Sequence, residues 1–175
     1  MALEDEYTRR CELQTDINRH LPMLSYLANN VRHITEFGIR EGHSTVALAY
    51  GHPQEMVSYD IEMPPINLIE MLKIELNYKF FIGNSIEVEI EPTDLLMIDS
   101  YHTYEHLTKE LTLHAGKVGK YIVIHDTITF GTIGEDGSRP GLLAAIREFL
   151  QSNPEWKFHY HSNLNNGLTV LERAK

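Results

Sequence analysis

The stretch that decides the fold is His-Ile-Thr-Glu-Phe-Gly-Ile-Arg-Glu-Gly-His-Ser, residues 33–44, which runs on through Thr-Val-Ala-Leu-Ala-Tyr to residue 50. The apolar run of residues 33–39 predicts a β-strand, and residues 44–50 predict the helix that follows it. Gly38 and Gly42 lie between the two, where glycine allows a tight turn and leaves the first N–H groups of the helix free. The stretch therefore predicts a strand–turn–helix unit whose turn a ligand can approach closely.

The same alternation continues along the chain. Strands joined through helices form a largely parallel sheet that helices cover on both faces. Near the end, Trp156, Phe158 and Tyr160 alternate with polar residues, and the Asn-Asn-Gly turn of residues 165–167 predicts a hairpin into a last strand. We therefore expect an α/β, Rossmann-like fold with a mostly parallel seven-stranded sheet and an antiparallel C-terminal hairpin. The later strands are expected at residues 55–61, 79–82, 94–98, 121–124, 156–161 and 168–171, and the later helices after Pro64-Pro65 and at about 104–118 and 141–150.

Length and composition indicate one domain spanning residues 1–175, with a helical N-terminal arm at 1–32 and the core at 33–175. Twenty-five Asp and Glu against 15 Lys and Arg give a formal net charge of −10, which disfavours nucleic acid and membrane surfaces as partners. The acidic first residues and the single Cys11 favour a cytoplasmic protein. We expect a small-molecule substrate and leave open whether the chain forms a homodimer.

Polar residues follow the predicted strands at the points where each strand ends. The carboxyl ends of parallel strands meet at one edge of an open α/β sheet, where ligands bind. We therefore expect these residues to build one polar site. Six acids are expected in or beside this edge: Glu36, Asp60, Glu62, Asp94, Asp99 and Asp126.

The glycine turn is neither a P-loop nor the dinucleotide fingerprint, because Arg40 and His43 stand where that fingerprint needs glycine. Taken alone, the turn is equally compatible with a plain connection that binds no ligand. Asp60, at the end of the second strand, favours a nucleoside cofactor, because an acid there can accept hydrogen bonds from ribose hydroxyls. The alternative interpretation of Asp60 is a solvated loop acid.

The stretch of residues 34–61 resembles motif one and the acidic strand-two end of class I S-adenosylmethionine (SAM) dependent methyltransferases. Two further blocks, Asp-Leu-Leu-Met-Ile-Asp-Ser-Tyr-His-Thr-Tyr-Glu at 94–105 and Tyr-Ile-Val-Ile-His-Asp-Thr at 121–127, are similar to the small O-methyltransferases grouped with macrocin and rhamnosyl O-methyltransferases and cephalosporin hydroxylase-like proteins. The resemblance covers about residues 33–171. It implies methyl transfer from SAM to a small-molecule acceptor, with a hydroxyl oxygen as the expected target.

The resemblance also assigns parts of the cofactor to positions in this sequence. This sequence departs from the family pattern at Asn84, where Asp is usual, and at Ser100 and Tyr101. The implied contacts are Glu36, Gly38, Gly42 and Ser44 around the methionine part of SAM, Asp60 with Ile61 at the ribose, and Asn84 and Ser85 beside adenine.

Asp99 and Asp126 are expected to end neighbouring strands, so that their carboxylates approach one cation. Two carboxylates, waters and a substrate oxygen suit Mg²⁺, which would activate the acceptor hydroxyl. In the alternative, both acids act without metal, and Asp99 contacts the cofactor. His102 and His125 are candidate general bases, because a neutral imidazole accepts a proton near pH 7, although either is also explained as a structural histidine.

Three other functions are weighed against methyl transfer. A nicotinamide-dependent oxidoreductase would use Asp60 equally well, and a non-catalytic SAM- or nucleoside-binding module is compatible with the short chain. The pattern His-Thr-Tyr-Glu-His at 102–106 matches a zinc peptidase motif, but His102 is expected before the helix and so off the face that His106 occupies. The glycine-containing segment of residues 128–140 is predicted to be a lid over the acceptor.

Overall fold

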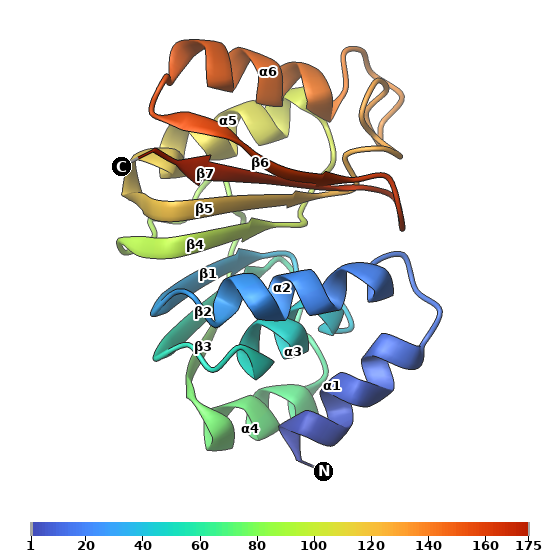
Figure 1. Cartoon of the computed structure of the whole chain (residues 1–175), viewed down its shortest axis with the longest axis vertical. Helices are drawn as coiled ribbons and strands as arrows, with labels where there is room; N and C mark the ends of the chain where they lie inside the picture. Colours follow the sequence, from blue (N-terminus) through green and yellow to red (C-terminus); the bar gives the residue numbers. More distant parts are fainter. Residues whose placement is uncertain (1, 175) are drawn as a thin grey trace.

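The computed structural model describes residues 2–174 and contains one seven-stranded sheet in the order β3-β2-β1-β4-β5-β7-β6 (Figure 1). Strands β1 to β5 pair in parallel, whereas β7 runs antiparallel to both β5 and β6. The predicted fold class is confirmed. The strands are β1 His33–Phe37, β2 Glu55–Asp60, β3 Asn77–Ile82, β4 Thr93–Ile98, β5 Val118–His125, β6 Trp156–Ser162 and β7 Leu168–Arg173. The helices are α1 Leu3–Glu12, η1 Asn18–His20, α2 Leu21–Ala28, α3 His43–Tyr50, α4 Ile66–Glu75, α5 Tyr104–His114, η2 Ala115–Lys117 and α6 Leu142–Ser152.

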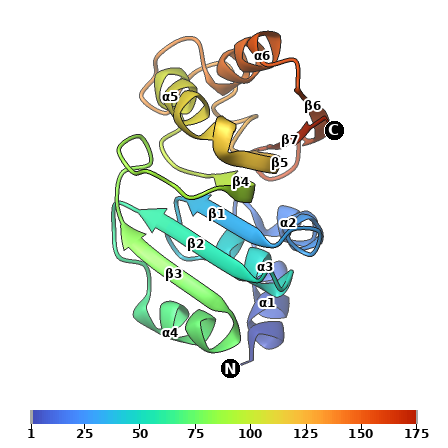
Figure 2. The same ribbon diagram turned by 90° about the vertical axis from the view of Figure 1, so that its left-hand side faces the viewer.

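The apolar core lies on both faces of the sheet. Along β4, Leu95 and Met97 pack toward one side, while Leu96 and Ile98 pack toward the other. The first side is covered by α1 to α4 and the second by α5 and α6, so the helices form two outer layers (Figures 1 and 2). Because both faces of β4 are buried, its sequence is a continuous apolar run rather than an alternating one.

Most element boundaries lie within three residues of the predicted ones, and two of the differences have a clear physical reason. The helix expected to reach residue 118 ends at His114, and β5 already begins at Val118, which pairs with Thr93 of β4. The first strand, expected to reach residue 39, ends at Phe37 because Gly38 adopts a left-handed φ of +82° and turns the chain. The expected N-terminal arm consists of α1, η1 and α2, with Pro22 in the first turn of α2. None of the helices within residues 2–174 has the length and apolar character needed to cross a membrane.

The carboxyl ends of β1 and β4 lie against each other at Gly38. Phe37 pairs with Ile98, and the backbone N–H of Asp99 donates to the carbonyl oxygen of Phe37 at 2.9 Å. A Cβ atom built on Gly38 would lie 2.0 Å from the backbone oxygen of Asp99, which is closer than any two such atoms can come. A glycine is therefore required at residue 38 both by its φ angle and by the neighbouring strand.

Replacing Gly38 with alanine is expected to destabilise the fold by about 2–4 kcal/mol, because the new methyl group adds backbone strain to a clash with β4. Urea unfolding followed by circular dichroism measures the change in unfolding free energy. Gly116→Ala is the matched control, since nothing lies within 4 Å of its added Cβ, and its effect should stay within about 0.5 kcal/mol. Equal effects of the two substitutions would contradict this account of Gly38.

Candidate active site

A pocket of about 340 Å³ opens at the carboxyl end of β1. Gly42, with φ of +75°, is the N-cap of α3, so the first N–H groups of that helix are free at this end. The turn of residues 39–44 forms one wall, the segment of residues 15–17 forms the opposite wall, and Asp99 closes the end toward β4. The lining residues are Thr15, Asp16, Ile17, Ile39, Arg40, Glu41, His43, Ser44 and Asp99.

Glu36 lies beneath this pocket rather than in its lining. Its carboxylate is fully buried and accepts hydrogen bonds from Ser44 Oγ at 2.7 Å, Ser58 Oγ at 2.8 Å and Thr45 Oγ1 at 3.2 Å. Burial raises the pKa of Glu36 to about 7, and the three hydroxyl donors oppose that rise. Among the predicted methionine contacts, Ser44 reaches the pocket, and Glu36 positions Ser44 from below.

The side chain of Asp60 connects the turn after β1 to the turn after β2. One carboxylate oxygen accepts the backbone N–H groups of Ile39 at 2.6 Å and Arg40 at 3.1 Å, and the other accepts that of Glu62 at 3.0 Å. The next residue, Ile61, is 70% exposed although it is aliphatic. An apolar side chain exposed beside an acid suits one face of a nucleoside, so this corner is compatible with the predicted ribose contact.

Asn84 and Ser85 form the turn after β3. The backbone oxygen of Asn84 accepts the N–H groups of Glu87 and Val88, which closes the turn. Ser85 is buried, and its hydroxyl lies 2.9 Å from Nε2 of His106. The predicted adenine contacts therefore lie at the same edge of the sheet as Asp60, with Asn84 the more accessible of the two.

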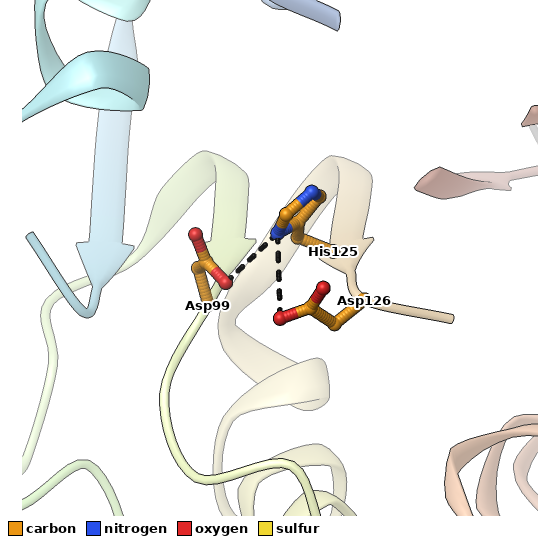
Figure 3. A group of neighbouring side chains, drawn as sticks. All are labelled: Asp99, His125 and Asp126. Atoms are coloured by element: carbon orange, nitrogen blue, oxygen red, sulfur yellow. Dashed lines mark hydrogen bonds and ion pairs between the residues drawn. The ribbon is translucent and has the colours of Figure 1, made fainter. Parts of the chain in front are cut away.

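Asp99, His125 and Asp126 meet at the ends of β4 and β5 (Figure 3), and His102, from the loop after β4, joins them. Oδ1 of Asp99 lies 3.2 Å from Nε2 of His102 and 3.1 Å from Nδ1 of His125. Oδ2 of Asp126 lies 3.1 Å from the same atom of His102 and 3.8 Å from the same atom of His125. The two acids and two imidazoles thus alternate in a closed ring, which we call the tetrad.

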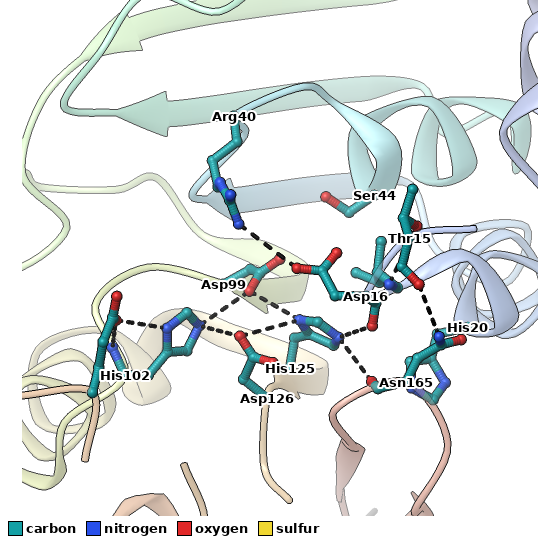
Figure 4. Close-up of polar contacts among 12 residues, drawn as sticks. Thr15, Asp16, His20, Arg40, Ser44, Asp99, His102, His125, Asp126 and Asn165 are labelled. Carbon is teal, nitrogen blue, oxygen red and sulfur yellow. Dashed lines mark hydrogen bonds and ion pairs between the residues drawn. The ribbon is translucent and has the colours of Figure 1, made fainter. Parts of the chain in front are cut away.

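The outer nitrogen of each tetrad imidazole also faces an acceptor. Nε2 of His125 lies 3.1 Å from the backbone oxygen of Asp16 and 3.3 Å from that of Asn165, whereas Nδ1 of His102 lies 3.0 Å from a carboxylate oxygen of Glu135 (Figure 4). Carbonyl and carboxylate oxygens only accept, so both nitrogens of each ring donate. When both nitrogens carry hydrogen, each ring is an imidazolium ion whose charge offsets one of the two carboxylates.

The electrostatics agree with these donor assignments at Asp99, His102 and His125, whereas Asp126 shifts the other way. Burial disfavours the charged form of His125, but Asp99 and Asp126 outweigh it and raise the pKa of His125 to about 9. The same balance raises the pKa of His102, and the two imidazoles hold the pKa of Asp99 below its ordinary value despite burial. Burial raises the pKa of Asp126.

His102 connects the tetrad to the segment of residues 128–140. Its ring stacks on Phe130 with centroids 5.1 Å apart, and the backbone N–H of Glu135 donates to its carbonyl oxygen at 2.9 Å. Helix α5 begins at Tyr104, so His102 precedes it, while His106 points to Ser85. The two histidines of the zinc peptidase pattern therefore have different partners, and residues 102–106 form no joint metal site.

Sequence reasoning missed the contribution of the N-terminal arm and of the β6–β7 turn. Asp16 and Thr15 line the pocket, and the Asn165 side chain binds both the backbone oxygen of Thr15 and the N–H of Arg19. Asn165 has a left-handed φ of +36° within the turn that the Asn-Asn-Gly pattern predicted, but no local pattern showed that the turn reaches the arm. These contacts join segments about 150 residues apart.

Asp94 was expected beside this edge, and that expectation was wrong. It lies at the start of β4 and hence at the opposite edge of the sheet. Its carboxylate accepts the backbone N–H groups of Arg32 and His33. A shallow hollow of about 430 Å³ near it, lined also by Asn30 and Lys120, is remote from the tetrad and holds no comparable cluster. The functional chemistry is therefore concentrated at the carboxyl edge.

Comparison with solved structures places this architecture among methyltransferases. The O-methyltransferase from Bacillus cereus in complex with S-adenosylhomocysteine (SAH) is 16% identical, covers 90% of this chain and 81% of its own, and has a TM-score of 0.63. SAH-bound PaMTH1 from Podospora anserina is 16% identical over 99% and 88% of the two chains, with a TM-score of 0.62. TomG, an O-methyltransferase of tomaymycin synthesis from Streptomyces achromogenes in complex with SAM, is 16% identical over 90% and 81%, with a TM-score of 0.62. The similarity to these structures shows that the chain has the fold of SAM-dependent methyltransferases.

The chain belongs to the Rhamnosyl O-methyltransferase/CmcI family, whose model matches residues 12–174. It is accordingly a SAM-dependent methyltransferase, as the glycine turn and the two strand-end blocks had indicated, and not a nicotinamide oxidoreductase. No curated protein sequence shows significant similarity to it.

The tetrad predicts how stability depends on pH when a chelator keeps metal ions away. Below about pH 6.5 the imidazole of His125 is protonated in the folded and the unfolded chain, so its ion pair contributes in full. Between that pH and about 9 only the folded chain keeps the proton, so the contribution falls as pH rises and is lost above about 9. Urea unfolding of wild type and His125→Asn should differ most at pH 6 and least at pH 10. A difference that is constant over this range would contradict the ion pair.

Proposed function

We propose that this protein transfers the methyl group of SAM to a hydroxyl oxygen of a small-molecule acceptor, assisted by a divalent cation. The observation that carries the proposal is the position of Asp99, which both closes the pocket at β1 and belongs to the tetrad. A cofactor in the pocket and an acceptor over the tetrad would therefore meet at one residue. Holding two reactants in contact is itself a large part of catalysis.

The cofactor is proposed to lie across the ends of β1, β2 and β3. Its methionine part would occupy the pocket beside Gly38, Gly42 and Ser44, where free helix N–H groups suit a carboxylate. Asp60 retains unused lone pairs for the ribose hydroxyls, with Ile61 beside it. Asn84 and Ser85 would border adenine. The known complexes of similar fold, with SAM or SAH bound, support the choice of cofactor.

A divalent cation is proposed at Asp99 and Asp126, where the sequence predicted Mg²⁺. The residues present fit such an ion, because both carboxylates lie within 4.8 Å of one another and of Nδ1 of His125. Oδ1 of Asp126 is buried and has no hydrogen-bond partner, and Asp126 itself has a strained φ of +58°. When bound, a cation there would lower the pKa of the acceptor hydroxyl and orient its oxygen.

His102 is proposed as the group that accepts the hydroxyl proton. Of the two candidate bases, His125 is 1% exposed and sealed by two backbone carbonyls, so it cannot reach an acceptor. His102 is more accessible, and Glu135 accepts its Nδ1–H, which leaves Nε2 facing the tetrad as the basic atom of the neutral ring. A carboxylate that fixes the tautomer in this way makes Glu135 a positioning residue for His102.

The acceptor is proposed to bind over the ends of β4 and β5, beneath residues 128–140. This segment is fixed at its base, where the N–H of Phe130 donates to the backbone oxygen of Asp126 and the N–H of Leu142 donates to the backbone oxygen of Phe130. Between these points, Ile133 is exposed and Gly137 has open space around it. A fixed base and an open tip suit a lid that closes over a small molecule such as a sugar or polyketide-like hydroxyl.

Asp60→Ala is expected to weaken SAH binding at least about tenfold, because it removes hydrogen bonds to the ribose and the anchor of the glycine turn. Calorimetry measures the affinity, with Glu62→Ala as a matched control at a neighbouring exposed acid. NAD tested in parallel should bind more weakly than SAH. Unchanged affinity in Asp60→Ala would contradict the ribose assignment, and tighter binding of NAD would contradict the cofactor.

His102→Gln is expected to lower kcat by about 10²–10⁴-fold and to leave SAH affinity unchanged, because it removes the proton acceptor alone. Methyl transfer from radiolabelled SAM to a panel of methyl glycosides and phenols provides the assay. Wild-type activity should rise with pH as His102 loses its proton, and Glu135→Gln, which removes a carboxylate that raises the pKa of His102, should shift that limb to lower pH. A limb that Glu135→Gln leaves in place would contradict the positioning role, and full activity of His102→Gln would exclude His102 as the base.

A further inference from the structure

We propose that the cation site selects a late first-row transition ion, such as Fe²⁺, Co²⁺ or Zn²⁺, over Mg²⁺, because His125 supplies one of its ligand atoms. The inference rests on the proposed function only in using the same cation site. Its basis is the group formed by Asp99, His125 and Asp126, in which a ring nitrogen and two carboxylate oxygens lie within 4.8 Å of one another (Figure 3).

The ring of His125 is oriented so that Nδ1, and not Nε2, faces the carboxylates. Nε2 donates its hydrogen to the carbonyl oxygens of Asp16 and Asn165, which hold the ring from the arm and from the β6–β7 turn. An ion would replace the proton that Nδ1 otherwise donates to Asp99, and that proton would leave to solvent. Ligating histidines usually donate their other N–H to a carbonyl or carboxylate, which fixes the tautomer, and His125 is already held in that way.

The carboxylate of Asp126 is only partly satisfied by hydrogen bonds. Oδ1 of Asp126 has no partner although the Asp126 side chain is only 8% exposed. A buried carboxylate that is short of donors is costly, and a cation bound to the Asp126 carboxylate would offset its charge.

The donor set determines which ion is favoured. Mg²⁺ prefers oxygen ligands in an octahedral shell and keeps several waters, whereas imidazole nitrogen binds Fe, Ni, Cu and Zn well. Affinity for nitrogen-containing sites rises along the first row from Mn²⁺ toward Cu²⁺. One buried imidazole among two carboxylates therefore shifts the preference away from Mg²⁺. An acid at residue 125 would give the all-oxygen set that Mg²⁺ prefers.

The test is a calorimetric titration of the metal-free full chain with Co²⁺ and with Mg²⁺. Wild type should bind Co²⁺ at least about 100-fold more tightly than Mg²⁺, and His125→Glu should reduce this ratio at least about tenfold. In the Co²⁺-loaded wild type, the Nε2–H of His125 should give a strongly shifted, solvent-exchangeable proton resonance that is missing from His125→Glu. Asp126→Asn should lose affinity for both ions.

Two controls separate this inference from binding elsewhere and from misfolding. His159→Gln removes an exposed histidine on β6 and should leave the Co²⁺ affinity unchanged, since ten histidines offer adventitious sites. SAH calorimetry checks that each variant is folded. The wild-type ratio and the shifted resonance remain informative even when His125→Glu fails to fold.

Comparable affinities for the two ions in wild type, an unchanged ratio in a folded His125→Glu, or no ion bound at all would overturn the inference. Each of these results leaves SAH binding intact and so leaves methyl transfer standing. Failure of the wild-type chain to bind SAM or SAH would instead contradict the proposed function, whatever ion it binds.

Discussion

The close approach of Gly38 to Asp99 is the constraint on which the site depends. The end of β1 lies so near the end of β4 that residue 38 cannot carry a side chain, and the backbone N–H of Asp99 donates to Phe37 at this point. Any larger residue would separate the two strands at their carboxyl ends. Because they touch, Asp99 reaches both the pocket formed by the glycine turn and the tetrad formed with β5. One contact thus joins two binding regions that the chain builds from separate segments.

Charge compensation explains why so many ionisable groups lie together at this edge. Buried charges destabilise a protein unless they are paired and hydrogen-bonded. In the tetrad every acid lies beside two imidazoles, and His125 is secured further by backbone carbonyls from the arm and from the β6–β7 turn. The partial exception is Asp126, with one oxygen unpartnered, and this is where a positive charge would be best placed. The net charge of −10 is therefore a poor guide to the site itself, which is close to neutral when both imidazoles are protonated.

Much of this arrangement was predictable because its signals are local. Apolar runs that end in acid or amide located Asp60, Asp99 and Asp126, since parallel strands bring such ends to one edge. Features that depend on contacts between residues far apart in the sequence were not predictable. The start of β5 at Val118 is set by its pairing with Thr93, and the burial of Glu36 is set by hydroxyls on α3 and β2. The arm contributes Asp16 to the pocket through contacts with Asn165, about 150 residues away, and nothing in residues 13–17 marks that role.

The two imidazoles connect the tetrad to different segments around the proposed site. His125 contacts the arm that forms one wall of the cofactor pocket, while His102 contacts residues 128–140 over the proposed acceptor. Loss of either partner would leave an imidazole nitrogen without its acceptor and would change the charge balance at Asp99, which both rings share. A change at the arm and a change at residues 128–140 would therefore act on the same carboxylate. Coupling of this kind needs only one shared carboxylate, and Asp99 lies where both sides meet.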